Sequence, residues 1–187
     1  MLGKNNNGEV RASTPQGFVG MYDFLGNLGK GHFAVVKLAQ HVLSKQRVAV
    51  KVIDKSKLKK DEEAHMQHEI QVMKLLRHPH VIRLYQVCNT NSRIYLILEL
   101  GDGGDLYERI NKHGAFSEDK ARHFFKQITE AVAYCHNNHV AHRDLKPENV
   151  VFRTNKHGEE VAKVRASRVL CVCVCVCVCV WVLLYSC

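Results

Sequence analysis

A glycine-rich segment at residues 101–104 divides the chain into two stretches with different hydrophobic periodicity. Before it, short apolar runs rich in β-branched residues, separated by Gly-rich or polar breaks, predict antiparallel strands. The predicted strands are residues 22–29, 34–41, 47–52, 81–87 and 93–100. One helix, residues 61–76, carries an apolar stripe at helical spacing and is stopped by Pro79. The first half of the chain therefore predicts a complete α+β lobe with a five-stranded antiparallel sheet and one helix.

The part of the chain after residue 104 has a helical composition. Ser117 is a candidate N-cap for a helix that continues to His136, whereas residues 142–152 are predicted as a loop and residues 161–164 as a short strand. Because little chain remains to cover this helix, we expect Phe124, Phe125 or Ile128 to be exposed. The predicted domains are a disordered leader, an N-terminal lobe, a partial helical C-terminal lobe and a low-complexity tail, at residues 1–21, 22–101, 102–164 and 165–187.

The charge balance is basic, with 27 Lys and Arg residues against 18 Asp and Glu residues and a formal charge of +9. The densest group of lysines lies between residues 51 and 60, and three acidic residues follow it at once. No aromatic residues are interleaved there as platforms for stacking bases. The pattern favours a solvated surface, and we expect no nucleic-acid partner.

The cysteines are unevenly placed, since six of the eight lie between residues 171 and 187. Only Cys88 and Cys135 belong to the body of the chain, and two isolated thiols do not form a disulfide framework. The first 20 residues contain no apolar signal segment. These features predict a reducing environment, cytoplasmic or nuclear.

A loop that starts at Gly29 and Gly31 lies between the first two predicted strands, where glycines allow backbone N–H groups to approach phosphates closely. A glycine-rich hairpin turn without a ligand explains the loop alone equally well. Lys51 ends the apolar run 48–50 at a distance that would place its ammonium over those phosphates. Glu69, on the inward side of the predicted helix, would orient Lys51, although a solvated helix glutamate is an equal alternative.

Residues 142–149 read HRDLKPEN, and their polar groups match the tasks of phosphoryl transfer. Asp144 can accept the proton of a substrate hydroxyl, and Lys146 can neutralise the phosphoryl group that is transferred. Asn149 can hold a metal ion. A chance occurrence of this octapeptide after the glycine loop, Lys51 and Glu69 is negligible.

Together these motifs resemble the front half of a eukaryotic protein kinase domain. The phrases GHFAVVKLA (31–39), LILELGDGGDL (96–106) and HRDLKPENVVF (142–152) are similar to the AMP-activated-kinase-related branch and its SNF-related members. A lysine two residues after Asp144 is the form seen in serine/threonine kinases. The resemblance covers residues 22 to about 164. It implies a kinase-like fold and ATP-dependent phosphorylation of serine or threonine in a protein substrate, with ATP and Mg²⁺ as cofactors.

The resemblance also assigns residues to the nucleotide. Three side chains would enclose the adenine, namely Val36, Ala49 and Val151. Leu98 would be the gatekeeper, and the backbone from Glu99 to Gly101 would be the hinge that forms hydrogen bonds with the adenine. Asp105 would meet the ribose. His142 and Arg143 would belong to the regulatory and structural core of the domain.

The pattern breaks after the short strand predicted at residues 161–164. Kinases continue there into Asp-Phe-Gly, which supplies a magnesium ligand, whereas this chain continues with Arg165 and Ala166 and contains no aspartate after Asp144. An activation loop and the later helices of the large lobe are also missing from the pattern. The resemblance therefore implies negligible phosphate transfer by this truncated chain. The alternative is a fragment that binds ATP or a partner without catalysis.

Three interpretations of the tail compete. Cys and Val alternate strictly from residue 171 to residue 180, which a repeated TG dinucleotide encodes, so the tail matches intronic repeat read as protein. Residues 169–185 also form an apolar run at the lower limit of the ~17–25 residues of a membrane helix, so membrane tethering is a second alternative. Binding of soft metal ions by the thiols is the third.

Overall fold

The computed structural model describes residues 21–31 and 34–166. The predictions for the leader up to residue 20 and for the tail from residue 167 lie outside the described residues. Within the described residues, no helix is both long and apolar enough to cross a membrane.

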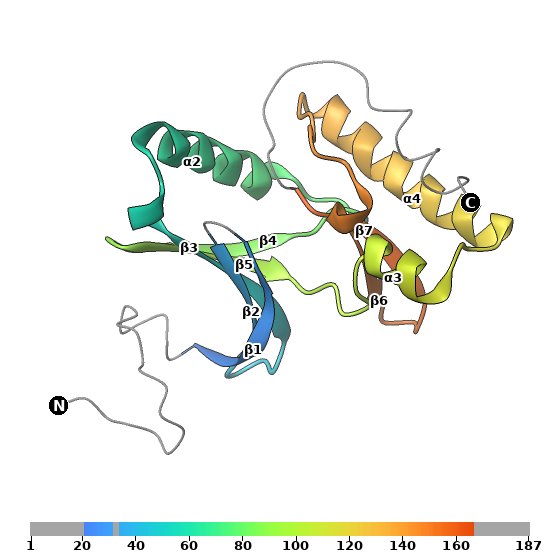
Figure 1. The fold of residues 1–187 in the computed structure, drawn as a ribbon, viewed down its shortest axis with the longest axis horizontal. Helices are drawn as coiled ribbons and strands as arrows, with labels where there is room; N and C mark the ends of the chain where they lie inside the picture. The colour runs from blue at the N-terminus through green and yellow to red at the C-terminus, as the bar shows by residue number, and fades with distance from the viewer. Residues whose placement is uncertain (1–20, 32–33, 167–187) are drawn as a thin grey trace.

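The first half of the chain forms one antiparallel sheet in the order β1-β2-β3-β5-β4 (Figure 1). Its strands are β1 (Tyr22–Lys30), β2 (Ala34–His41), β3 (Arg47–Asp54), β4 (Leu84–Asn89) and β5 (Arg93–Glu99). A short 3-10 helix, η1 (Lys55–Lys57), follows β3. The five-stranded antiparallel sheet predicted from the apolar runs is therefore confirmed.

The single helix of this lobe is α2 (Lys60–Leu75), which agrees with the predicted helix to within one residue at each end. The Glu62 carboxylate accepts a hydrogen bond from the Lys59 N–H at 2.8 Å, so it satisfies a donor at the start of the helix. Ile70 and Met73 are buried in one cluster with Ile53 and Ile94 of the sheet. The apolar stripe of α2 thus packs on one face of the sheet.

The predicted strand at 81–87 begins three residues too early. Residues 81–83 lie outside β4, because Val81 forms an isolated parallel bridge with Val164. The Ile82 N–H donates to the Val164 carbonyl, and the Val164 N–H donates to the His80 carbonyl, both at 2.9 Å. This apolar segment therefore joins the two halves of the chain instead of extending the sheet.

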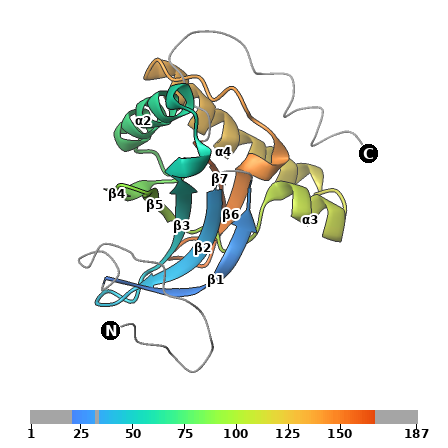
Figure 2. The same ribbon diagram turned by 60° about the vertical axis from the view of Figure 1, so that its left-hand side comes forward.

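The second half of the chain consists of two helices packed with a small hairpin (Figure 2). The helices are α3 (Leu106–His113) and α4 (Glu118–Asn137), and the 3-10 helix η2 (Pro147–Asn149) precedes the hairpin of β6 (Val150–Thr154) and β7 (Glu160–Val164). β7 was predicted, whereas β6 begins inside the segment predicted as a loop and extends two residues beyond it. Phe152 in β6 is fully buried, so tertiary packing selects a strand there. The partial helical second lobe is confirmed.

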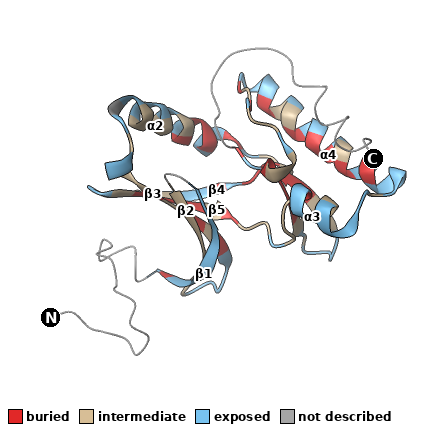
Figure 3. Ribbon diagram, viewed as in Figure 1, coloured by how far each residue is buried: buried red, intermediate tan, exposed pale blue. Residues whose placement is uncertain are grey.

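The expectation that the apolar face of α4 would be exposed is wrong, since none of the three residues is exposed. Phe124 and Ile128 are each only 2% exposed, and Phe125 packs at the edge of the same cluster. The Phe124 ring lies 4.8 Å from the ring of Phe152, centroid to centroid. Figure 3 shows buried residues along one side of α4, and this helix packs against β7. Ser117 precedes α4 as predicted, but its side chain makes no capping hydrogen bond.

Candidate functional site

The strand register places the predicted nucleotide-binding residues in rows across the sheet. Gly29 lies opposite Val36, Val36 opposite Lys51, and Lys51 opposite Leu96. Residues directly opposite each other in antiparallel strands project from the same face. A β-carbon added at Gly29 would have no atom within 4 Å, so the sheet leaves open space beside this row.

A second row lies beside the first on the same face, because side chains alternate along each strand. Ala49 is opposite Leu98 of β5 and opposite Leu38 of β2. Val36 and Ala49 are partly buried, and Leu98 is partly buried against the main core cluster. The residues predicted to enclose the adenine therefore share a face with Lys51.

The face that carries Lys51 also packs against α2. Ile53, two residues after Lys51, belongs to the same buried cluster as Ile70, which follows Glu69 in the helix. Lys51 and Glu69 are both partly buried. Their direct ion pair remains a prediction.

Gly101, in the predicted hinge, is in close contact with β6. A β-carbon at Gly101 would lie 2.8 Å from side-chain carbons of Val151, which is too close for any larger residue without movement. Gly103 is similarly restricted, because a β-carbon there would lie 2.8 Å from the Phe152 Cβ. These contacts bring Val151, the third predicted adenine contact, next to the hinge.

The main chain of Glu99 lies in the predicted hinge, whereas its side chain projects from the other face of the sheet. Glu99 pairs with Val48, one position along from the pair of Leu98 and Ala49, so its carboxylate projects away from the predicted adenine contacts. That carboxylate accepts hydrogen bonds from Arg153 and Lys163 instead. Only the backbone of Glu99 is left to meet an adenine.

Asp105, predicted to meet the ribose, is also the N-cap of α3. Its Oδ1 accepts a hydrogen bond from the Glu108 N–H at 2.9 Å. Asp105 forms an isolated bridge with Val151, so the start of α3 lies beside the hinge and β6. One carboxylate oxygen thus fixes the helix start, and the ribose contact remains a prediction for the other, Oδ2.

The octapeptide places its three predicted catalytic residues in mutual contact. The Asn149 Nδ2 donates to the Asp144 Oδ2 at 3.0 Å and to the Asp144 carbonyl at 2.7 Å. The Lys146 Nζ lies 3.4 Å from the other carboxylate oxygen of Asp144. Arg143 has a φ of 58°, a left-handed conformation that is uncommon outside glycine and that turns the chain just before Asp144. Asp144 is therefore fixed by neighbours on both of its oxygens.

His142 is buried beneath this loop and links it to the end of β7. Its Nε2–H donates to the Arg165 carbonyl, and its Nδ1 accepts from the Asp144 N–H at 3.3 Å. Burial lowers the pKa of His142, and the Arg165 carbonyl and the Asp144 charge oppose this shift only in part. The two hydrogen bonds fit a neutral imidazole with its hydrogen on Nε2.

The residues around Asn149 do not fit a complete magnesium site. Asn149 can offer its Oδ1, but Arg165 and Ala166 follow β7, and neither has an oxygen in its side chain. Among residues 21–31 and 34–166, no three His, Cys, Asp or Glu side chains gather as a metal site. Within the described residues, the aspartate that the resemblance predicts as the second metal ligand is absent.

Three contacts of the site were not found from the sequence. The close approach of Gly101 to Val151, the Gln127 side chain that accepts from the Ala162 N–H, and the Arg165 carbonyl that holds His142 all join distant segments. Two of these contacts use a backbone N–H or carbonyl group. Every residue type carries such groups, so the sequence does not indicate which partner they have. The glycines of the 101–104 segment were the only signal, since glycine permits close packing.

Comparison with known proteins shows the family of the chain. The model of the protein kinase domain family matches residues 22–165. SNF-related serine/threonine-protein kinases of Homo sapiens and Rattus norvegicus are 56% identical over 134 residues, which are 71% of this chain and 18% of each relative. Serine/threonine-protein kinase SIK2 of Gallus gallus is 47% identical over 137 residues, which are 73% of this chain and 17% of that relative. The chain thus spans less than one fifth of the length of these relatives, and by its sequence and its fold it belongs to the protein kinase domain family.

Proposed function

We propose that the described residues form the nucleotide and phosphoacceptor site of a serine/threonine protein kinase, with phosphoryl transfer reduced to a negligible rate. The contact of Asn149 and Lys146 with Asp144 carries this proposal. This contact holds the Asp144 carboxylate in a position to accept a proton from a serine or threonine hydroxyl. The division into lobes at residues 22–101 and 102–164 is part of the same proposal.

The face of the sheet that carries Val36, Ala49 and Lys51 would receive ATP. The adenine would lie between this face and Val151, with the backbone at Glu99 and Gly101 as hydrogen-bonding partner. Asp105 would bind the ribose through Oδ2, and the loop at Gly29 and Gly31 would cover the phosphates. This assignment is supported by the shared face and by the open space at Gly29.

Phosphoryl transfer depends on electrostatic stabilisation of charge that develops on the phosphoryl oxygens, often ~3 kcal/mol for each group. A chain without the aspartate metal ligand lacks one such group, and ~3 kcal/mol corresponds to more than about a hundredfold in rate. We expect no phosphorylation of a basic serine peptide above the level of Asp144→Ala. Robust labelling that Asp144→Ala abolishes would contradict the loss of activity and support an active kinase.

A second candidate function is ATP binding without catalysis, which the intact nucleotide face favours. ATP should raise the melting temperature of the chain, and Lys51→Ala should abolish most of that rise because the phosphates lose a cation. Lys74→Ala, an exposed lysine on α2, is the matched control and should keep the rise. Equal increases of the melting temperature in the parent chain and both variants would mean that ATP binds away from Lys51.

Cytoplasmic or nuclear location, also proposed, is supported by Cys88 and Cys135, which are free thiols in the described part of the chain. ATP and a protein with a serine or threonine hydroxyl are the partners that the family implies.

A further inference from the structure

The side of the sheet that carries the Glu99 carboxylate contains a cavity of about 390 Å³. Residues 77–79, Arg83, Tyr85, Glu99, Arg153 and Lys163 line it. Because side chains alternate along β5, Glu99 and this cavity lie on the opposite face from Leu98 and the proposed adenine contacts. We call it the basic cavity.

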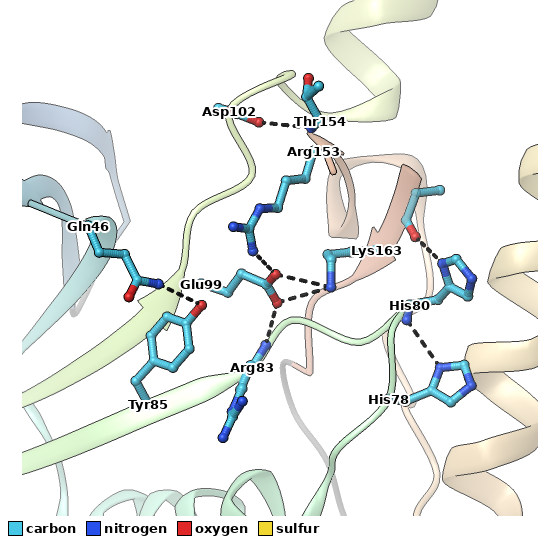
Figure 4. Close-up of polar contacts among 11 residues, drawn as sticks. Gln46, His78, His80, Arg83, Tyr85, Glu99, Asp102, Arg153, Thr154 and Lys163 are labelled. Atoms are coloured by element: carbon cyan, nitrogen blue, oxygen red, sulfur yellow. Dashed lines mark hydrogen bonds and ion pairs between the residues drawn. The ribbon is translucent and has the colours of Figure 1, made fainter. Parts of the chain in front are cut away.

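The basic cavity holds four cations and one carboxylate. Arg77, Arg83, Arg153 and Lys163 supply the positive charges, and Glu99 supplies the negative one. Figure 4 shows Arg153, Lys163 and the main chain of Arg83 meeting at the Glu99 carboxylate, whereas the side chain of Arg83 extends away from it. The cavity therefore retains three positive charges that Glu99 does not balance.

Glu99 cannot take up further cations. One of its oxygens accepts from Arg153, and the other accepts from the Arg83 N–H and from Lys163, each of these two at 3.1 Å. Within the described residues, the guanidinium groups of Arg77 and Arg83 form no ion pair, and both arginines are exposed. Arg83 lies 5.7 Å from the ring centre of Tyr85.

We propose that the basic cavity binds a phosphate monoester. The planar guanidinium presents paired N–H donors that match phosphate oxygens, and a dianion matches an excess of three positive charges better than a single carboxylate does. The volume of the cavity lies in the range of sites for small ligands, roughly 300–1,000 Å³. The Tyr85 hydroxyl accepts a hydrogen bond from Gln46 at 3.1 Å, so its own hydrogen can be donated to the ligand.

His78, which lines the cavity, provides a reporter of binding. Its pKa lies below the ordinary value because burial disfavours the charged ring and the charges of His80 and Lys163 repel it, while Glu130 has the opposite effect. A phosphate in the cavity would favour the charged ring and raise this pKa. The same readout is insensitive to catalysis, so it tests this site separately from the proposed function.

The test is an NMR titration of the His78 ring in the whole chain. The probes are inorganic phosphate, O-phosphoserine and an Ala-Ala-pSer-Ala-Ala peptide, at constant ionic strength, with the unphosphorylated peptide as the blank. We expect a saturable shift of the His78 ring signals. The affinity obtained from this shift should be at least tenfold weaker in Arg77→Gln/Arg83→Gln. Arg122→Gln/Lys126→Gln removes the same charge from exposed positions on α4 and should bind like the parent chain.

The arms of this experiment have separate meanings. A peptide that binds at least tenfold more tightly than O-phosphoserine identifies a phosphorylated protein segment as the ligand, and equal affinities identify a free phosphorylated molecule. Absence of a saturable shift, or equal loss in both double variants, would overturn the proposal. Lys51→Ala must retain the shift, since its loss would place the phosphate in the nucleotide site. Arg83→Gln alone, which keeps the backbone bond to Glu99, replaces the double variant if that protein does not fold.

Discussion

At the scale of single residues, His142 connects the HRDLKPEN loop to the position where the kinase pattern breaks. Its two ring nitrogens have different partners, the Arg165 carbonyl and the Asp144 N–H. The side chains of Arg165 and Ala166 supply no metal ligand, but the backbone of Arg165 still positions His142. Thus the scaffold that supports Asp144 persists although the second metal ligand is missing.

The lowered pKa of His142 predicts that the free energy of unfolding falls in mild acid. The folded chain keeps the ring neutral below its ordinary pKa of 6.5, whereas the unfolded chain binds a proton there. Unfolding is therefore increasingly favoured as the pH falls from 6.5 towards the folded-state pKa, by at most about 1.4 kcal/mol per pH unit. Urea unfolding at several pH values measures this slope.

His142→Phe should reduce that slope, even though it also lowers the overall stability through the lost hydrogen bonds. His157→Gln, an exposed histidine in the β6–β7 turn, should leave the slope unchanged. The same slope in the parent chain and in His142→Phe would show that His142 does not titrate differently on unfolding.

At the scale of elements, the contact between α4 and β7 supports the second lobe. Gln127 is buried on α4, and its Oε1 accepts a hydrogen bond from the Ala162 N–H at 2.7 Å. Ala162 is itself fully buried, so this N–H has no access to water. One polar side chain thus satisfies a backbone donor within an apolar cluster that contains Phe124 and Phe152.

Gln127→Leu should destabilise the chain by about 1–3 kcal/mol, since it leaves the Ala162 N–H buried and without an acceptor. Chemical unfolding in urea measures the change. Lys126→Leu, one residue earlier and exposed, is the control and should change the stability by less than about 0.5 kcal/mol. A loss equally small in both variants would mean that the Ala162 N–H finds another partner.

At the scale of the whole molecule, Glu99 joins the two halves of the chain. It lies at the end of β5 in the large sheet, and its partners Arg153 and Lys163 come from β6 and β7. The backbone bridge between Val81 and Val164 lies at the same junction. The relative position of the two lobes therefore depends on a buried charge cluster as well as on apolar contacts.

Glu99→Gln should lower the free energy of unfolding by about 3 kcal/mol. Lys163 is only 8% exposed, so its charge would remain buried without a counterion. The pair of Lys55 and Glu63 provides the comparison, since the Glu63 side chain is 42% exposed and water can screen its charge. Glu63→Gln should cost less than about 1 kcal/mol. Urea unfolding of the parent chain and the two variants measures these losses of stability. Equal losses in both variants would mean that water solvates the Lys163 ammonium when Glu99 is replaced.

Much of the fold follows from local patterns. Apolar runs with β-branched residues predicted the five strands, and helical spacing predicted α2 and α4, because periodicity within one segment determines which face is apolar. The HRDLKPEN octapeptide and the run before Lys51 were sufficient to indicate the family, since their residues are adjacent in sequence.

Only the tertiary structure decided how distant segments meet. The burial of Phe124 involves contact with the Phe152 ring, in a strand at Val150–Thr154 that local sequence did not predict. The turn of the Glu99 carboxylate away from the nucleotide face follows from the pairing of β5 with β3 and from partners more than fifty residues later in the chain. Local sequence encodes which side of an element is apolar, whereas the identity of the opposing surface is set by the long-range packing of the whole chain.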